Sequence, residues 1–98
     1  MDHIAHTLLS AIRYAHGRSL HPYEHVVAAF RQLWPTLDPD SRQNLLNLVR
    51  SQVPDDLQRM IKATRPGSIC PVSRQELEDE LNAYLDLISW CEHNMVQP

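Results

Sequence analysis

Apolar residues recur at helical spacing along most of this chain, in segments separated by proline and glycine. The longest segment covers residues 73–94, where apolar residues follow one another at intervals of three and four and so share one side of a helix. After Tyr84 the apolar positions spread to both sides of this stripe, so we expect the second half of the helix to be covered on most of its circumference. The apolar positions are Leu77, Leu81, Tyr84, Leu85, Leu87, Ile88, Trp90, Cys91 and Met95.

Residues that favour helix ends indicate where the helices start and stop. Ser73 and Glu76 have the spacing of a capping box, in which each side chain bonds the backbone N–H of the other residue. Asp38 followed by Pro39 is a second start signal, because aspartate caps free N–H groups and proline lacks the N–H that the first helical position leaves unbonded. The remaining signals are Asp2 and Pro22 at helix starts and Gly17 at a helix end.

These signals predict a single all-α domain over residues 1–98, a compact bundle of about five helices that ends in a long C-terminal helix. No stretch alternates between apolar and polar residues as a half-buried strand does. The chain is long enough to bury roughly 60–70% of its unfolded surface. Pro54 is expected to separate the third helix from the fourth, and Pro66–Gly67 to end the fourth. The expected helices are 3–16, 22–34, 39–53, 55–64 and 73–94.

The charges are unevenly distributed. Residues 1–72 hold six acids against seven arginines and one lysine, a net charge of +2, whereas residues 73–98 hold six acids against Arg74, a net charge of −5. The acidic last helix either docks on the arginine-bearing body of the same fold or presents negative charge to a basic partner. The residues expected to face that partner are Glu76, Asp79, Glu80 and Asp86.

The start of the chain, its apolar runs and its cysteines indicate the compartment in which the protein is expected. The start of the chain lacks the basic segment of a secretory signal, and no apolar run approaches the ~20 residues of a membrane helix. The two cysteines, Cys70 and Cys91, are too few for a disulfide scaffold and lack the paired spacing of a zinc site. We therefore expect a cytoplasmic protein with free thiols and no membrane contact.

No catalytic or cofactor-binding pattern is present. The chain has two glycines, too few for a phosphate-binding loop, and its cysteines have no base placed beside them by the sequence. His21 and His25 stand four residues apart, as zinc-binding pairs on helices do, but no third ligand follows at a familiar spacing. We expect neither an enzyme nor a metal or other cofactor.

Nucleic-acid binding is the alternative interpretation. The third and fourth helices, joined at Val53–Pro54, have the order of a helix-turn-helix, and the fourth carries Arg59, Lys62 and Arg65 at every third position. Acids at the start of that helix and the net negative charge of the chain oppose contact with phosphates. Nucleic acid is therefore the less favoured partner.

Protein binding remains the leading hypothesis. The last helix contains residue types that are frequent at the centres of interfaces. These residues either form the core of this chain, pair with a second copy in a homodimer, or bind a different protein. The candidate interface residues are Tyr84, Leu87, Trp90 and Met95.

Small size, mild acidity and the lack of a catalytic pattern are typical of small regulators and inhibitors that bind and occlude a larger protein. In this general respect the chain is similar to inhibitors of phages and mobile elements, anti-CRISPR proteins among them, although it shares no residue motif with them. The resemblance implies an inhibitory partner interaction and assigns no site residue.

Overall fold

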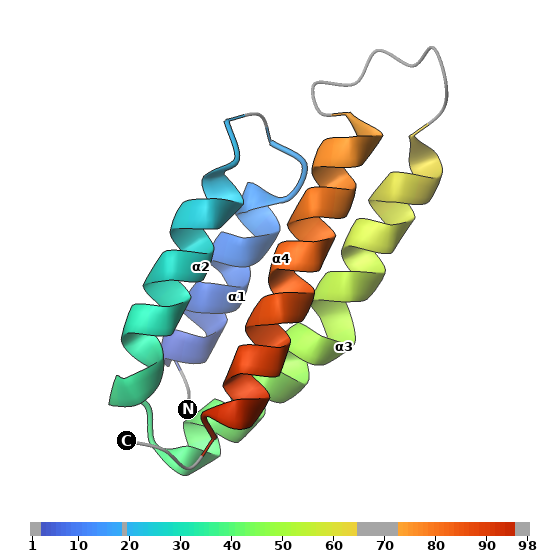
Figure 1. The fold of residues 1–98 in the computed structure, drawn as a ribbon. Coiled ribbons are helices and arrows are strands. Elements are labelled where there is room, and N and C mark those ends of the chain that lie inside the picture. The colour runs from blue at the N-terminus through green and yellow to red at the C-terminus, as the bar shows by residue number, and fades with distance from the viewer. Residues whose placement is uncertain (1–2, 19, 65–72, 96–98) are drawn as a thin grey trace.

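The computed structural model describes residues 3–18, 20–64 and 73–95. Within these ranges four α-helices and one short 3-10 helix account for the fold (Figure 1). The α-helices are α1 (His3–Ala15), α2 (Pro22–Leu33), α3 (Pro39–Ala63) and α4 (Arg74–His93), and the 3-10 helix is η1 (Trp34–Thr36).

The helices form an up-down-up-down bundle that measures 47 × 21 × 18 Å (Figure 1). Helix α4 packs against α2 and α3, and α1 packs against the same two helices from the other side. Helices α2 and α4 run in the same direction, so both begin at the end of the bundle where α1 finishes. We call this end the loop end, because the connection from α1 to α2 crosses it.

Every helix contributes apolar side chains to one continuous core. Helix α3 places Val53 and Leu57 in it with no exposed surface, and α4 does the same with Tyr84 and Leu87. The all-α class is therefore confirmed. None of the helices in the described ranges is both long and apolar enough to cross a membrane.

The predicted helix count is wrong by one, because α3 continues through Pro54 where a break was expected. Proline removes the N–H that would donate to the carbonyl of Arg50 and normally ends or kinks a helix. Here Val53 and Leu57, on either side of the proline, extend one buried apolar stripe. Core packing along this stripe outweighs the tendency of Pro54 to end the helix.

The predicted helix starts at Ser73 and at Asp38–Pro39 are confirmed. Ser73 Oγ accepts from the Glu76 N–H at 3.2 Å, and Glu76 Oε2 accepts from the Ser73 N–H at 3.0 Å. Asp38 Oδ1 accepts from the Ser41 N–H at 2.7 Å and caps α3. Asp2, the expected cap of the first helix, lies outside the described residues.

Helix α1 ends at Ala15, one residue earlier than expected, and Gly17 follows with a φ of 66°. A side chain at Gly17 would be strained at this angle and would also clash with the Met60 methyl group. The Met60 methyl group ends a flexible side chain and can move aside, so the positive φ is the feature that favours glycine here.

Candidate functional site

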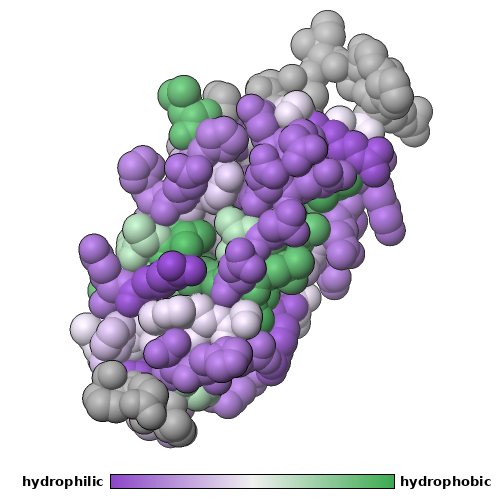
Figure 2. Space-filling view, in the orientation of Figure 1, coloured by the Kyte–Doolittle hydropathy of each residue, from purple (hydrophilic) through white to green (hydrophobic). Residues whose placement is uncertain are grey.

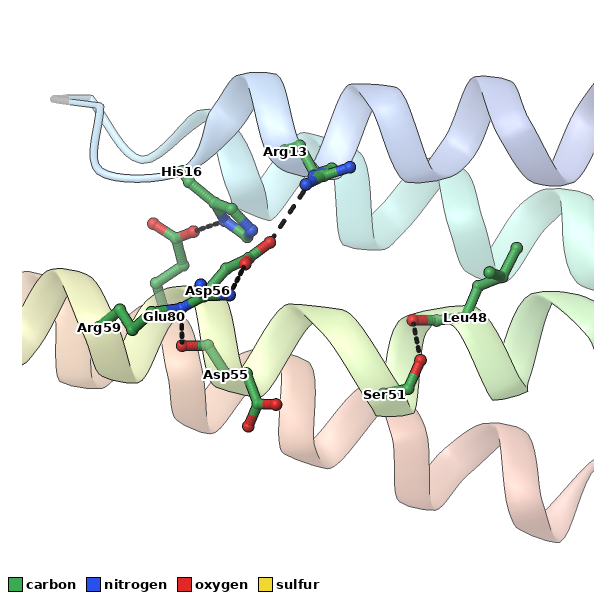
Figure 3. A network of polar contacts seen from close by, with 8 residues as sticks. All are labelled: Arg13, His16, Leu48, Ser51, Asp55, Asp56, Arg59 and Glu80. Atoms are coloured by element: carbon green, nitrogen blue, oxygen red, sulfur yellow. Dashed lines mark hydrogen bonds and ion pairs between the residues drawn. The ribbon is translucent and has the colours of Figure 1, made fainter.

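A buried histidine–glutamate hydrogen bond lies just beneath the α1–α2 loop. His16 Nδ1 is 2.7 Å from Glu80 Oε2, and their side chains are 7% and 2% exposed (Figure 3). The other carboxylate oxygen of Glu80 accepts from the Gly17 N–H at 3.2 Å. Glu80 therefore binds the first loop residues through both oxygens and ties the end of α1 to α4.

Two tyrosines complete this polar cluster inside the bundle. The rings of His16 and Tyr84 meet edge to face at 5.8 Å, and the Tyr23 ring lies 6.3 Å from that of Tyr84. Burial raises the pKa of Tyr84, and the charge of Glu80 raises it further. His16 Nε2 and the Tyr84 hydroxyl are both buried without a hydrogen-bond partner. Such groups carry a desolvation penalty, and the cluster is closed to an external substrate.

The sequence contains a signal for this pair that the prediction did not use. Glu80 follows Leu77 by three residues and precedes Tyr84 by four, so it occupies the apolar stripe of its helix. His16 follows Ile12 by four residues on the stripe of α1. The predicted outward position of Glu80 is wrong, because its place in the apolar stripe of α4 buries it against His16 and Gly17.

The α1–α2 loop above the pair has unusual backbone geometry. Leu20 and His21 have φ angles of 67° and 52°, in the left-handed region that residues other than glycine rarely adopt. Each such residue costs about 1–2 kcal/mol. Leu20 is also 93% exposed, whereas the His21 ring packs edge to face on Tyr23 at 5.5 Å.

Acids from α2 and α4 gather beside this loop. Burial raises the pKa of Tyr23, at the start of α2, and four nearby carboxylates raise it further. They belong to Glu24, Asp79, Glu80 and Glu76. Glu80 is buried, and we call the other three residues the acidic end. None of the three forms an ion pair with a cation of the described residues. The surface of α2 and α4 near the loop end is correspondingly hydrophilic (Figure 2).

The four acids predicted to face a partner thus occupy different environments. Asp79 and Asp86 are exposed, and Glu76 is half-buried and holds the capping box. Glu80 belongs to the core. Sequence reasoning missed Glu24, because its position near Tyr23 together with the acids of α4 depends on the packing of α2 against α4.

The apolar half of α4 is covered by its own chain only in part, since Leu85 remains 45% exposed. Tyr84 and Leu87 are fully buried, so neither offers its surface to a partner or a second copy in this fold. Trp90 is half-buried, with the Arg31 guanidinium 5.7 Å from its ring centre. Met95 is also half-buried and packs against the core. The placement of Tyr84 and Leu87 fits the core alternative.

At the opposite end of the bundle, Arg42 joins three segments. Its guanidinium donates to the carbonyl oxygens of Trp34 at 3.1 Å, Pro35 at 3.2 Å and Met95 at 3.0 Å. Trp34 in turn donates from its indole nitrogen to the Asn94 carbonyl at 2.9 Å. These contacts hold η1 and the residues after α4 against α3 at this end of the bundle. Sequence spacing alone does not indicate them.

Two residues of the predicted nucleic-acid face, Arg59 and Lys62, are exposed on one continuous helix. A helix-turn-helix needs two helices at a steep angle, and α3 has no turn at Pro54.

A shallow hollow on the surface of α3 is lined by Asp55, Gln58, Arg59 and Lys62, and Arg59 also binds Asp56 at 2.8 Å. Figure 3 shows Asp56 between Arg59 and Arg13. Arg65 lies outside the described residues, as does Cys70.

Metal-ligand geometry is absent from the described part of the chain, where no three His, Cys, Asp or Glu side chains converge. His25 is exposed, and the His21 ring packs edge to face on Tyr23.

We found no match to this chain among protein-family models, curated protein sequences or solved structures.

Proposed function

We propose that this chain is a non-enzymatic interaction module that binds a positively charged surface of another protein and acts as a small regulator or inhibitor. The observation that supports this most strongly is the acidic end, where carboxylates from two helices gather and form no ion pair with any cation in the part of the chain that the structure describes. The exposed Asp86 extends the negative charge along α4.

The arrangement also has a structural explanation. Acids in the first turn of a helix offset its dipole, and both α2 and α4 begin at the loop end. That explanation covers Glu24 and Glu76, which lie in first turns. It does not cover Asp79 or Asp86, which lie deeper in α4. An exposed, unneutralised pair at these positions favours a role outside the fold.

Electrostatic complementarity of this kind mainly raises the association rate and selects the partner. We therefore expect the partner surface to carry Lys or Arg, and association to slow as salt screens the charges. Occlusion of that surface is the simplest action for a chain of this size.

The test is affinity capture from cells that produce the chain, followed by association kinetics with the recovered protein. Glu24→Lys/Asp79→Lys should lower the association rate constant about tenfold at low salt. Asp40→Lys/Asp55→Lys is the matched control, because it changes the charge equally and also alters one first-turn and one mid-helix acid. Equal association by both double variants, or no effect of the first, would refute the acidic contact. Circular dichroism should show that both variants are folded.

A further inference from the structure

Leu20 combines two features that are seldom found together. An exposed leucine alone needs no explanation, since much of any protein surface is apolar. Leu20, however, is 93% exposed and also held at a φ of 67°. Glycine or asparagine would adopt this angle with less strain. Neither packing in the core nor the backbone conformation at position 20 therefore explains why this residue is a leucine. Figure 2 shows apolar surface projecting at this end of the α1–α2 hairpin.

The loop that carries Leu20 is held firmly from below. Glu80 accepts from the Gly17 N–H and contacts the His16 ring, both from within the bundle. Pro22 begins α2 and disfavours the right-handed helical conformation at His21 before it. These restraints before and after Leu20 reduce the conformational entropy that its segment loses when it binds, which favours affinity.

The surroundings of Leu20 differ on its two sides. In the last turns of α1, Tyr14 is 71% exposed, and the Arg18 guanidinium lies 4.1 Å from its ring centre. Toward α2 and α4 stands the acidic end. An apolar tip beside unneutralised carboxylates is complementary to an apolar pocket with cations at its rim.

We propose that Leu20 is the anchor residue of the interface and inserts into an apolar pocket on a protein partner, with Lys or Arg of the pocket rim facing the acidic end. This inference rests on the proposed function and names the contact that slows dissociation. Charge excludes three other occupants. Anionic lipid headgroups and nucleic-acid phosphates would be repelled by the acidic end, and a symmetric second copy would place two acidic ends together.

The first experiment places the photo-crosslinker p-benzoylphenylalanine at position 20 of the full chain in cells. The control carries it at Ala29, on the exposed side of α2. We expect a protein adduct from position 20, with its crosslinked peptide near apolar residues and at least one Lys or Arg. The adduct should weaken when Glu24→Lys/Asp79→Lys is added. An adduct with lipid, nucleic acid or a second copy, or an equal yield from position 29, would overturn the proposal.

The second experiment measures dissociation of the crosslinked protein from the variants Leu20→Asn and Leu20→Met. Leu20→Asn suits the left-handed angle and removes the apolar tip, so we expect the dissociation rate to rise roughly tenfold with the melting temperature unchanged or higher. Leu20→Met keeps an apolar tip and should bind like the wild type. Unchanged dissociation of Leu20→Asn would refute the anchor while leaving the acidic contact in place. Failure of Glu24→Lys/Asp79→Lys to slow association would instead refute the proposed function.

Discussion

His16 Nδ1 lies 2.7 Å from Glu80 Oε2 in the interior of the bundle, a contact between residues 64 positions apart. The pair joins the first helix to the last and brings the α1–α2 loop against α4. Because both side chains are almost completely buried, the contact has energetic consequences that surface ion pairs lack.

Glu80→Ala should lower the free energy of unfolding by about 3 kcal/mol, because it leaves buried polar groups of His16 and Gly17 without their acceptor. Urea unfolding followed by circular dichroism measures the loss. Glu78→Ala is the control, since Glu78 pairs with Arg74 on the surface at 3.3 Å and should contribute less than about 1 kcal/mol. Similar losses for the two variants would contradict the assigned role of the buried pair.

Tyr84→Phe should leave the free energy of unfolding unchanged or raise it by up to about 1 kcal/mol, because the buried hydroxyl that it removes has no partner. Tyr14→Phe, at an exposed ring, should change it by less than about 0.5 kcal/mol. The same urea titration tests both variants. A clear loss in Tyr84→Phe would mean that the hydroxyl is bonded in solution, for example to an internal water molecule.

Asp38 should contribute a stability that depends on pH. Hydrogen bonds from Ser41 hold the pKa of the Asp38 carboxyl below its ordinary value, so the charged form is favoured in the folded state. Its contribution is complete above the unfolded pKa of about 3.9 and is lost as the pH falls through the lower folded pKa. Asp38→Asn keeps a capping oxygen but cannot ionise. The stability difference between wild type and Asp38→Asn should therefore change only below about pH 4 in acid titrations, and a constant difference would contradict this.

Cys91 should be inert in the folded chain. Burial raises the pKa of its thiol to about 12, and the residue is 1% exposed. In a Cys70→Ser background, the reaction with Ellman's reagent at pH 8 should be at least about a thousandfold slower than in urea. Because the folded state disfavours the thiolate, stability should fall as the pH rises above about 8.5. Rapid labelling of the folded chain would show that the thiol is accessible.

Pro54→Ala should stabilise the chain by about 1–3 kcal/mol, since it restores a hydrogen bond inside a continuous helix. Pro39→Ala is the control, because Pro39 occupies the first turn of α3, where proline is favourable, and the change should bring no gain. Thermal unfolding distinguishes the two. A destabilised Pro54→Ala would indicate that the core is shaped around the proline.

Local signals predicted the helices well because capping is a short-range interaction. Ser73 with Glu76, and Asp38 with Ser41, involve partners three residues apart, and all of these atoms are visible in the sequence. Pro54 shows the limit of such rules. Its effect on the helix depends on whether the stripe through Val53 and Leu57 is buried by other helices, which the local sequence does not state.

The candidate site was harder to predict because its contacts are long-range. Glu80 stands among acids that face water, and its partner lies on a different helix. The acidic end depends on α2 and α4 running side by side in the same direction, which no motif encodes. Leu20 carried no signal at all, since its exposure and its backbone angle become visible only in the folded loop.

The directions of the helices also decide how the molecule should be held in an experiment. The start of α1 and the end of α4 lie together at the end of the bundle opposite the α1–α2 loop (Figure 1). A tag or surface linkage placed beyond either helix would leave Leu20 and the acidic end pointing away from the support. Immobilisation through either terminus is therefore the orientation in which the loop remains free to be recognised.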